Sequence, residues 1–169
     1  MDNIILIGMP AVGKSTVGVV VAKRLGYRFI DTNILIQEEE GKLLKDIIAE
    51  KGIDGFLEIE DRINANVIAK HSVISPGGSV VYCSEAMEHL KSIGKVVYLR
   101  LSLGTLEKRL GNLKKRGVLL KKGQTLQSLY EERVPLYEKY ADIVIDEEGK
   151  DLEASLQTVL ETLQTGVIK

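Results

Sequence analysis

Residues 8–16 read "GMPAVGKST" and fit the pattern G-x-x-x-x-G-K-[ST]. Gly8 and Gly13 can adopt backbone angles, and permit close approaches, that a side chain would prevent. Main-chain N–H groups can then turn inward around an anion, and a following helix adds free N–H groups and the positive end of its dipole. In this pattern Lys14 reaches the β- and γ-phosphates of a nucleotide, and the Ser15 hydroxyl is placed to ligate Mg²⁺.

The flanking residues supply the context that such a loop requires. An apolar run at 3–8 (NIILIG) predicts a short buried strand, and 14–25 predicts a helix that ends at Gly26. This order of strand, loop and helix indicates a true nucleotide-binding loop. Ala11 stands where many such loops carry glycine, a departure that we expect to be tolerated. The loop residues assigned to nucleotide binding are Gly8, Ala11, Val12, Gly13, Lys14, Ser15 and Thr16.

Strand-like and helix-like segments alternate along the rest of the chain, which is typical of a parallel α/β sheet. The remaining predicted strands are 28–31, 73–75, 95–101 and 142–145. The remaining predicted helices are 32–70, 84–92, 103–111, 126–140 and 151–164. With 169 residues, the sequence predicts one domain of α/β class with five strands.

Composition argues against several classes of protein. The net charge of −1 argues against a dedicated nucleic-acid binder, which would normally carry a strong excess of basic residues. No apolar run approaches the ~20 residues that a membrane-spanning helix needs. The single cysteine, Cys83, permits no intrachain disulfide, so the cytoplasm is the expected compartment. His71 and His89 have no neighbouring ligands at metal-binding spacing, and we expect structural or surface roles for both.

The charged segments narrow the class further. Residues 31–62 carry ten acids against four bases, whereas residues 108–122 carry seven bases and no acid. The motif N-K-x-D, with which GTPases read guanine, is absent. A hydrophobic strand that ends in Asp or Asp-Glu, the Walker B motif of AAA and transport ATPases, is absent as well. A compact nucleotide-binding protein with a basic insert near residue 115 indicates a small-molecule or nucleoside-monophosphate kinase that uses ATP and Mg²⁺.

The chain resembles the shikimate kinase family along nearly its whole length. The matching stretches are "GMPAVGKST", "FIDTN", Phe56-x-x-x-Glu60, "VISPGGS", "KKRGVLL" and "EERVPLYEKYAD". The resemblance implies a single domain over 1–169 with a three-layer P-loop kinase fold and strand order 2-3-1-4-5. It also implies an acceptor-binding segment at 32–62 and a mobile lid at 112–122. The implied partners are ATP or ADP and a small hydroxylated metabolite, without nucleic acid or membrane, in a monomer or weak dimer.

The resemblance also implies roles for individual residues. Asp31 would act through the water shell of a metal that Ser15 also holds, and Arg109 would pack near the adenine. Arg116 would belong to the lid. The residues implied in catalysis are Lys14, Asp31 and Arg116. The residues implied in acceptor binding are Asn33, Leu57, Gly77, Gly78, Ser79 and Arg133.

This chain departs from the family pattern on the acceptor side. Asn33 stands where the family has a second aspartate, Leu57 where it has an arginine that grips the substrate carboxylate, and Ser79 where it has a glycine. An amide cannot accept a proton at neutral pH, and general-base help is worth ~10²–10⁴ in rate. Loss of an arginine from a buried charged pair costs ~2–5 kcal/mol. Arg62 lies about 140° further round a helix and is a poor substitute.

These departures leave three hypotheses open. The chain could phosphorylate shikimate, with Arg133 and Arg116 sharing the carboxylate and Asn33 orienting the hydroxyl. It could instead phosphorylate another hydroxylated metabolite, neutral or amine-bearing, which the net charge of −6 over residues 31–62 would suit. A third hypothesis is a non-catalytic module that binds ATP or ADP, which the intact Lys14 and Ser15 disfavour.

Overall fold

Five parallel strands form the central sheet of the computed structural model, which describes residues 3–110 and 121–165. Their order along the sheet is β2-β3-β1-β4-β5, which confirms the predicted order. The strands are β1 (Asn3–Ile7), β2 (Arg28–Asp31), β3 (Ser72–Ser75), β4 (Lys95–Arg100) and β5 (Ile143–Asp146). In register, Ile5 pairs with Ile74 on one side and with Val96 on the other. The predicted strands are therefore confirmed to within about one residue at each end.

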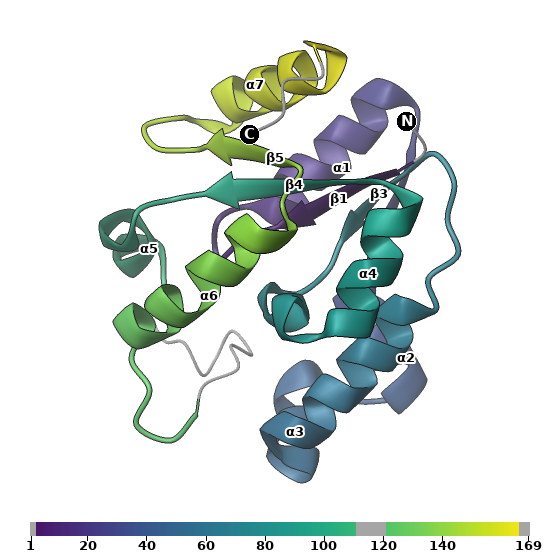
Figure 1. Ribbon diagram of the computed structural model, residues 1–169, viewed down its shortest axis with the longest axis vertical. Coiled ribbons are helices and arrows are strands. Elements are labelled where there is room, and N and C mark those ends of the chain that lie inside the picture. Colours follow the sequence, from purple (N-terminus) through teal and green to yellow (C-terminus); the bar gives the residue numbers. More distant parts are fainter. Residues whose placement is uncertain (1–2, 111–120, 166–169) are drawn as a thin grey trace.

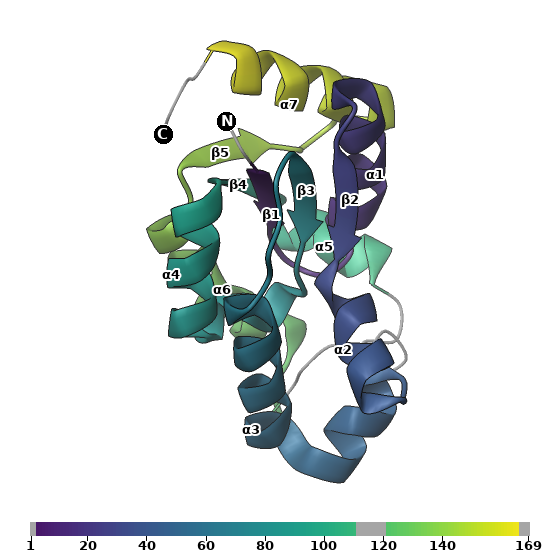
Figure 2. The same cartoon turned by 90° about the vertical axis from the view of Figure 1, so that its right-hand side faces the viewer.

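Helices cover both faces of this sheet and extend beyond the carboxyl ends of its strands (Figures 1 and 2). On one face lie α1 (Lys14–Leu25) and α7 (Leu152–Thr165), and on the other α4 (Ser84–Ile93) and α6 (Leu126–Tyr140). The remaining helices are α2 (Thr32–Glu40), α3 (Leu44–Ala65), α5 (Leu103–Arg109) and the short 3₁₀ helix η1 (Gly78–Tyr82). Figure 2 shows α2 and α3 projecting past the end of the sheet at which β2 finishes.

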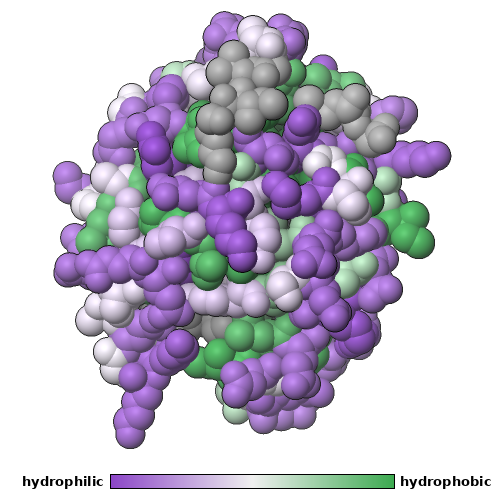
Figure 3. All heavy atoms as spheres, viewed as in Figure 1, coloured by the Kyte–Doolittle hydropathy of each residue, from purple (hydrophilic) through white to green (hydrophobic). Residues whose placement is uncertain are grey.

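The core lies between the layers because the inner strands are apolar on both faces. Every residue of β1 is buried, as expected for a central strand of a parallel sheet covered by helices on both sides. The visible surface in Figure 3 is largely hydrophilic, with hydrophobic side chains in small separate groups. No helix within 3–110 or 121–165 combines the length and apolar character needed to cross a membrane.

The prediction of continuous helix over 32–70 is wrong in part. Gly41 adopts a left-handed conformation and ends α2, and Gly52, also at positive φ, kinks α3. Helix α3 then ends at Ala65, because the Asn66 side chain and main chain both bond to the carbonyls of the last turn. Residues 66–71 are therefore not helical. The short helix η1 had no sequence signal that we identified.

Candidate active site

The loop after β1 wraps around the amino group of Lys14. The Nζ atom donates hydrogen bonds to the carbonyl oxygens of Gly8 and Met9, at 2.8 and 3.0 Å. A Cβ at Gly8 would lie 2.6 Å from the Leu99 carbonyl oxygen, so only glycine fits there. Ala11 tolerates a left-handed φ of 68°, a conformation that costs roughly 1–2 kcal/mol for a residue with a side chain. These contacts hold the loop closed around the Lys14 side chain.

Lys14 is buried at the bottom of this loop, and its charge is poorly solvated. Burial, reinforced by the nearby Arg133 and opposed by Asp31, lowers the pKa of Lys14 to about 7. A nearby anion favours the charged form of an amine. A bound phosphate would therefore restore the positive charge, which is the behaviour expected of a phosphate-binding lysine.

Asp31 joins the end of β2 to the start of α2. Its Oδ1 accepts a hydrogen bond from the Asn33 main-chain N–H at 2.9 Å and so caps the helix. Its Oδ2 lies 3.5 Å from the Ser15 hydroxyl. Hard oxygen atoms suit Mg²⁺, which usually takes one or two carboxylates together with substrate phosphates and water. Ser15 and Asp31 therefore fit a magnesium site, although the described residues contain no cluster of three metal-binding side chains.

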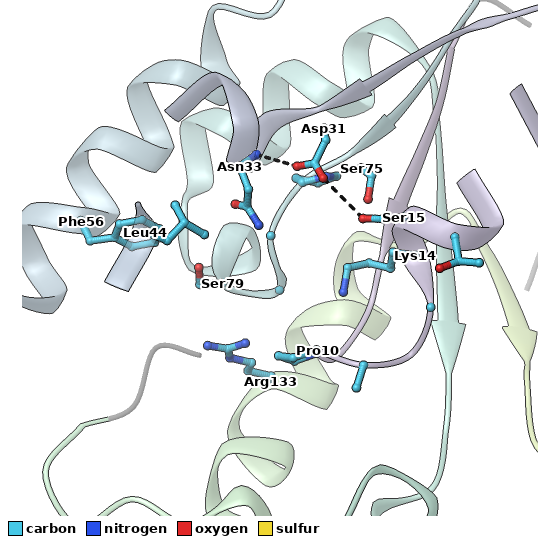
Figure 4. A pocket seen from close by; sticks show the side chains of 16 residues that line it. Pro10, Lys14, Ser15, Asp31, Asn33, Leu44, Phe56, Ser75, Ser79 and Arg133 are labelled. Atoms are coloured by element: carbon cyan, nitrogen blue, oxygen red, sulfur yellow. Dashed lines mark hydrogen bonds between the residues drawn. The ribbon is translucent and has the colours of Figure 1, made fainter. Parts of the chain in front are cut away.

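A cavity of about 270 Å³ opens between this loop, the start of α2, and the segment after β3. In Figure 4, Asn33 and Arg133 flank the space from opposite sides, Lys14 points into it, and Leu44 and Phe56 close one end. The cavity lies at the carboxyl ends of β1, β2 and β3, where parallel α/β sheets commonly bind ligands. Its lining residues are Pro10, Ala11, Gly13, Lys14, Ser15, Thr16, Asp31, Asn33, Leu44, Phe56, Ser75, Pro76, Gly77, Gly78, Ser79 and Arg133.

Most of the residues assigned from the sequence meet in this cavity, and a few lie elsewhere. Gly8 and Val12 are not part of the cavity lining: Gly8 packs against the Leu99 carbonyl, and Val12 is buried. The Arg109 guanidinium lies outside the cavity lining and donates to the Ala11 carbonyl at 3.2 Å. Arg116 and most of the predicted lid, 112–122, lie outside the described residues.

Leu57 does not line the cavity. It borders a neighbouring hollow of about 220 Å³, together with Tyr82 and Glu132. Arg62, the potential substitute for the missing arginine, is exposed and pairs with Glu39 on the outer surface. The structure therefore places no cationic side chain of α3 against the acceptor side of the cavity.

The acidic segment 31–62 does not make the cavity acidic. Of its ten acids, only Asp31 belongs to the cavity lining. Others form ion pairs on the surface with Lys42, Lys51 and Arg62. Among the described residues, the charges that line the cavity are those of Lys14, Arg133 and Asp31. The net charge of segment 31–62 therefore gives no support to a neutral or amine-bearing acceptor.

Arg133 is supplied by α6 and is only 1% exposed. Its Nε donates to the Tyr82 hydroxyl at 3.4 Å, and its guanidinium lies 5.4 Å from the centre of that ring. Tyr82 in turn donates to Glu132 Oε1 at 2.7 Å. The neighbouring Tyr137 donates to the Gly78 carbonyl at 2.7 Å, which ties α6 to the segment after β3. These contacts fix a buried positive charge beside the cavity.

Glu60 was missed as a site residue by the sequence analysis, although a signal was present. Phe56, Ile59 and Ile63 form an apolar stripe at helical spacing, and Glu60 falls within it. The Glu60 carboxyl is fully buried behind the cavity, and its Oε1 accepts a hydrogen bond from the Ser79 hydroxyl at 2.6 Å. Its Oε2 has no hydrogen-bond partner among the described residues. Burial raises the pKa of Glu60 to about 7, against the opposing effects of Ser79 and Arg133.

The raised pKa of Glu60 predicts a loss of stability with rising pH. The folded protein holds this proton more tightly than the unfolded chain, so unfolding releases it between the usual glutamate pKa and about 7. Between pH 5 and pH 8, we expect the unfolding free energy of the parent to fall by roughly 1–3 kcal/mol more than that of Glu60→Gln. Urea unfolding at both pH values measures this difference. Glu58→Gln, on the exposed face of the same helix, should behave as the parent, and equal behaviour of the two variants would contradict the assignment.

Comparisons with known proteins point to a single family. The family model described as "Shikimate kinase" matches residues 10–164. A shikimate kinase of Persephonella marina is 40% identical over 151 residues, covering 89% of this chain and 92% of the relative. One from Clostridium botulinum strain Kyoto is 41% identical and covers 96% of each chain.

Solved structures agree with this result. Shikimate kinase from Acinetobacter baumannii in complex with shikimate superposes with a TM-score of 0.88 at 28% identity, covering 100% of this chain and 96% of that one. Shikimate kinase from Aquifex aeolicus gives a TM-score of 0.82 at 30% identity, covering 97% of each chain. The matching family model and these relatives, together with the nucleotide-binding loop and the strand order, show that this chain belongs to the shikimate kinase family.

Proposed function

We propose that this protein transfers the γ-phosphoryl group of ATP to a hydroxyl of shikimate. One observation carries the proposal. A phosphate-binding loop with Lys14 and a buried Arg133 face the same cavity from different sides. A phosphoryl donor and an acceptor that bears a carboxylate could therefore meet there. Arginine is well suited to hold a carboxylate by charge-assisted hydrogen bonds.

The donor side would work by positioning and charge neutralisation. The loop N–H groups, Lys14 and the start of α1 would hold the β- and γ-phosphates, as in other proteins with such a loop. Ser15 and Asp31 would hold Mg²⁺, which supplies further neutralisation of the phosphate charge when it is bound. The proposal also assigns Arg109 to the adenine side and Arg116, within the proposed lid at 112–122, to the transferring phosphate.

The acceptor side would work by orientation. Arg133 would bind the carboxylate, and Gly77, Gly78 and Ser79 would form the adjoining floor. Asn33 would hydrogen-bond the reacting hydroxyl without taking its proton. In a loose phosphoryl-transfer transition state that proton leaves late, so an amide at this position is compatible with turnover. We further assign the protein to the cytoplasm, as a monomer or weak dimer.

A coupled assay of ADP release tests the proposal directly. The purified protein is supplied with ATP, Mg²⁺ and shikimate, and parallel reactions contain polyols, amino-alcohols and other hydroxy acids. We expect ADP release that depends on shikimate and saturates with it. Release that is independent of shikimate, with dependence on another compound, would identify a different acceptor.

A kinase of another hydroxylated metabolite is the second candidate, and Leu57 is the observation that favours it. This side chain borders the hollow next to the acceptor cavity and offers neither charge nor hydrogen bond. An acceptor held by Arg133 alone would be consistent with this arrangement.

Restoring both family residues should raise the activity on shikimate. Asn33→Asp with Leu57→Arg supplies a proton acceptor and a second cation, and we expect kcat/KM for shikimate to rise by roughly 10²-fold. Steady-state kinetics with shikimate as the varied substrate measure this change. Ala49→Arg, which adds the same single positive charge at an exposed position of α3, is the control. An unchanged kcat/KM in the double variant would show that the acceptor pocket differs at further positions.

A further inference from the structure

The side chains of Asn33 and Glu60 converge on Gly77. The position that a Cβ would take on Gly77 lies 2.8 Å from Asn33 Oδ1, 3.2 Å from Asn33 Nδ2 and 3.1 Å from Glu60 Oε2. The Asn33 amide and the Glu60 carboxylate oxygen thus lie around the same point, beside Gly77. That oxygen is buried and has no hydrogen-bond partner among residues 3–110 and 121–165. Asn33 itself lines the acceptor cavity, as Figure 4 shows.

We propose that Glu60 is a positioning residue for the acceptor, and that its charge state decides which atom of the Asn33 amide faces the bound hydroxyl. This inference rests on the proposed function. An ionised carboxylate only accepts hydrogen bonds, so it attracts Nδ2 and leaves Oδ1 toward the cavity. A protonated carboxyl donates, so it attracts Oδ1 and leaves Nδ2 toward the cavity. The terminal torsion of asparagine is broad, so rotation of the amide can exchange the two arrangements.

The two orientations have opposite effects on the acceptor. With Oδ1 toward the cavity, Asn33 accepts a hydrogen bond from the hydroxyl and leaves a lone pair of the hydroxyl oxygen free to attack phosphorus. The new P–O bond forms as the bond to ADP breaks, and the hydroxyl proton passes late to an oxygen of the transferred phosphoryl group. With Nδ2 toward the cavity, Asn33 donates to that oxygen and occupies the lone pair. The ionised form of Glu60 is therefore the form that supports transfer.

The surroundings of Glu60 allow this titration near neutral pH. From α6, Arg133 and Tyr137 exert electrostatic effects on it, and on its own helix so does Asp61. From the end of η1, Cys83 places its thiol 3.8 Å from Oε1. The side of α4 that is buried carries the uncharged residues Ala86, Met87 and Leu90. From α2 comes Asn33, which is also uncharged, and Glu60 forms no ion pair with any described residue.

Nuclear magnetic resonance of the Asn33 side-chain amide tests the pairing without any substrate. In the ligand-free protein we expect its ¹⁵N–¹H signals to shift with pH along a single titration curve with a midpoint near 7. Glu58→Gln should keep this curve, because Glu58 is exposed on the same helix. Glu60→Gln should abolish it. Asn33 signals that do not move in the parent, or that move equally in Glu60→Gln, would overturn the proposal.

The pH profile of turnover tests the consequence for catalysis. The pKa of Lys14 also lies near 7 in the ligand-free protein. The test therefore compares kcat of the parent with kcat of Glu60→Gln at each pH, at saturating ATP. Glutamine at position 60 can accept from Ser79 and donate to Asn33, so it imitates the protonated form. We expect Glu60→Gln to lower kcat with shikimate roughly tenfold at pH 8.5 and little at pH 6, with KM for ATP unchanged.

The amide titration and the pH profile of turnover distinguish a wrong role for Glu60 from a wrong acceptor. If the parent shows no shikimate-dependent ADP release at any pH, the acceptor is wrong, and the amide titration still decides the pairing of Asn33 with Glu60. A kcat that falls by the same factor at pH 6 and pH 8.5 in Glu60→Gln would indicate a merely structural role and would overturn the inference. Thermal unfolding of each variant checks that the fold is intact.

Discussion

Replacement of Lys14 by methionine should lower kcat by roughly 10²–10³-fold or more, because it removes the positive charge at the centre of the phosphate-binding loop. Methionine fills similar space, but it cannot neutralise charge on the transferring phosphoryl group. The change also leaves the carbonyls of Gly8 and Met9 without the hydrogen bonds that Nζ donates in the structure. We therefore expect weaker ATP binding in addition to slower transfer.

Two measurements separate these effects in the Lys14 variant. Steady-state ADP release gives kcat and KM for ATP, and isothermal titration with a non-hydrolysable ATP analogue gives affinity without turnover. Lys23→Met is the matched control, because Lys23 is exposed on the same helix. If Lys14→Met retained the parental kcat with shikimate, the loop would have no place in the mechanism.

Replacement of Arg133 by methionine should act almost entirely on the acceptor. Removing one partner of a buried charged pair costs ~2–5 kcal/mol, which corresponds to a loss of roughly 30- to several-thousand-fold in kcat/KM for shikimate. We expect most of this loss in KM for shikimate and little change in KM for ATP. Position 57 cannot compensate, because Leu57 carries no charge and lies outside the cavity lining.

The stability of the Arg133 variant needs separate attention, since the side chain also contacts Tyr82. Thermal unfolding identifies any general loss of structure. Arg133→Lys keeps a charge but cannot form the two parallel hydrogen bonds of a guanidinium, so intermediate activity is expected. Lys139→Met, on the exposed side of α6, should match the parent. A carboxylate-free acceptor would instead be turned over equally well by the parent and Arg133→Met.

The nucleotide side of the site was predictable because its signals are local. Gly8, Gly13 and Lys14 are close in sequence, and the loop, helix α1 and its left-handed cap at Gly26 form through contacts within a few residues. The strand order was predictable as well, but from resemblance to a family rather than from the pattern of apolar residues. Helix α3 was only partly predicted, since Gly52 and Asn66 redirect the chain in ways that helical periodicity does not record.

The sequence by itself therefore determined a five-stranded α/β domain with a phosphate-binding loop, and it named the residues of that loop. Only the tertiary structure decided which acids face the cavity and which face solvent. It also decided that Leu57 borders a separate hollow, and that Glu60 is buried against Ser79 beside Asn33. The physical reason is the range of the interactions. Caps and loops depend on neighbours in sequence, whereas burial and the pairing of α3 with the segment after β3 depend on how distant elements pack.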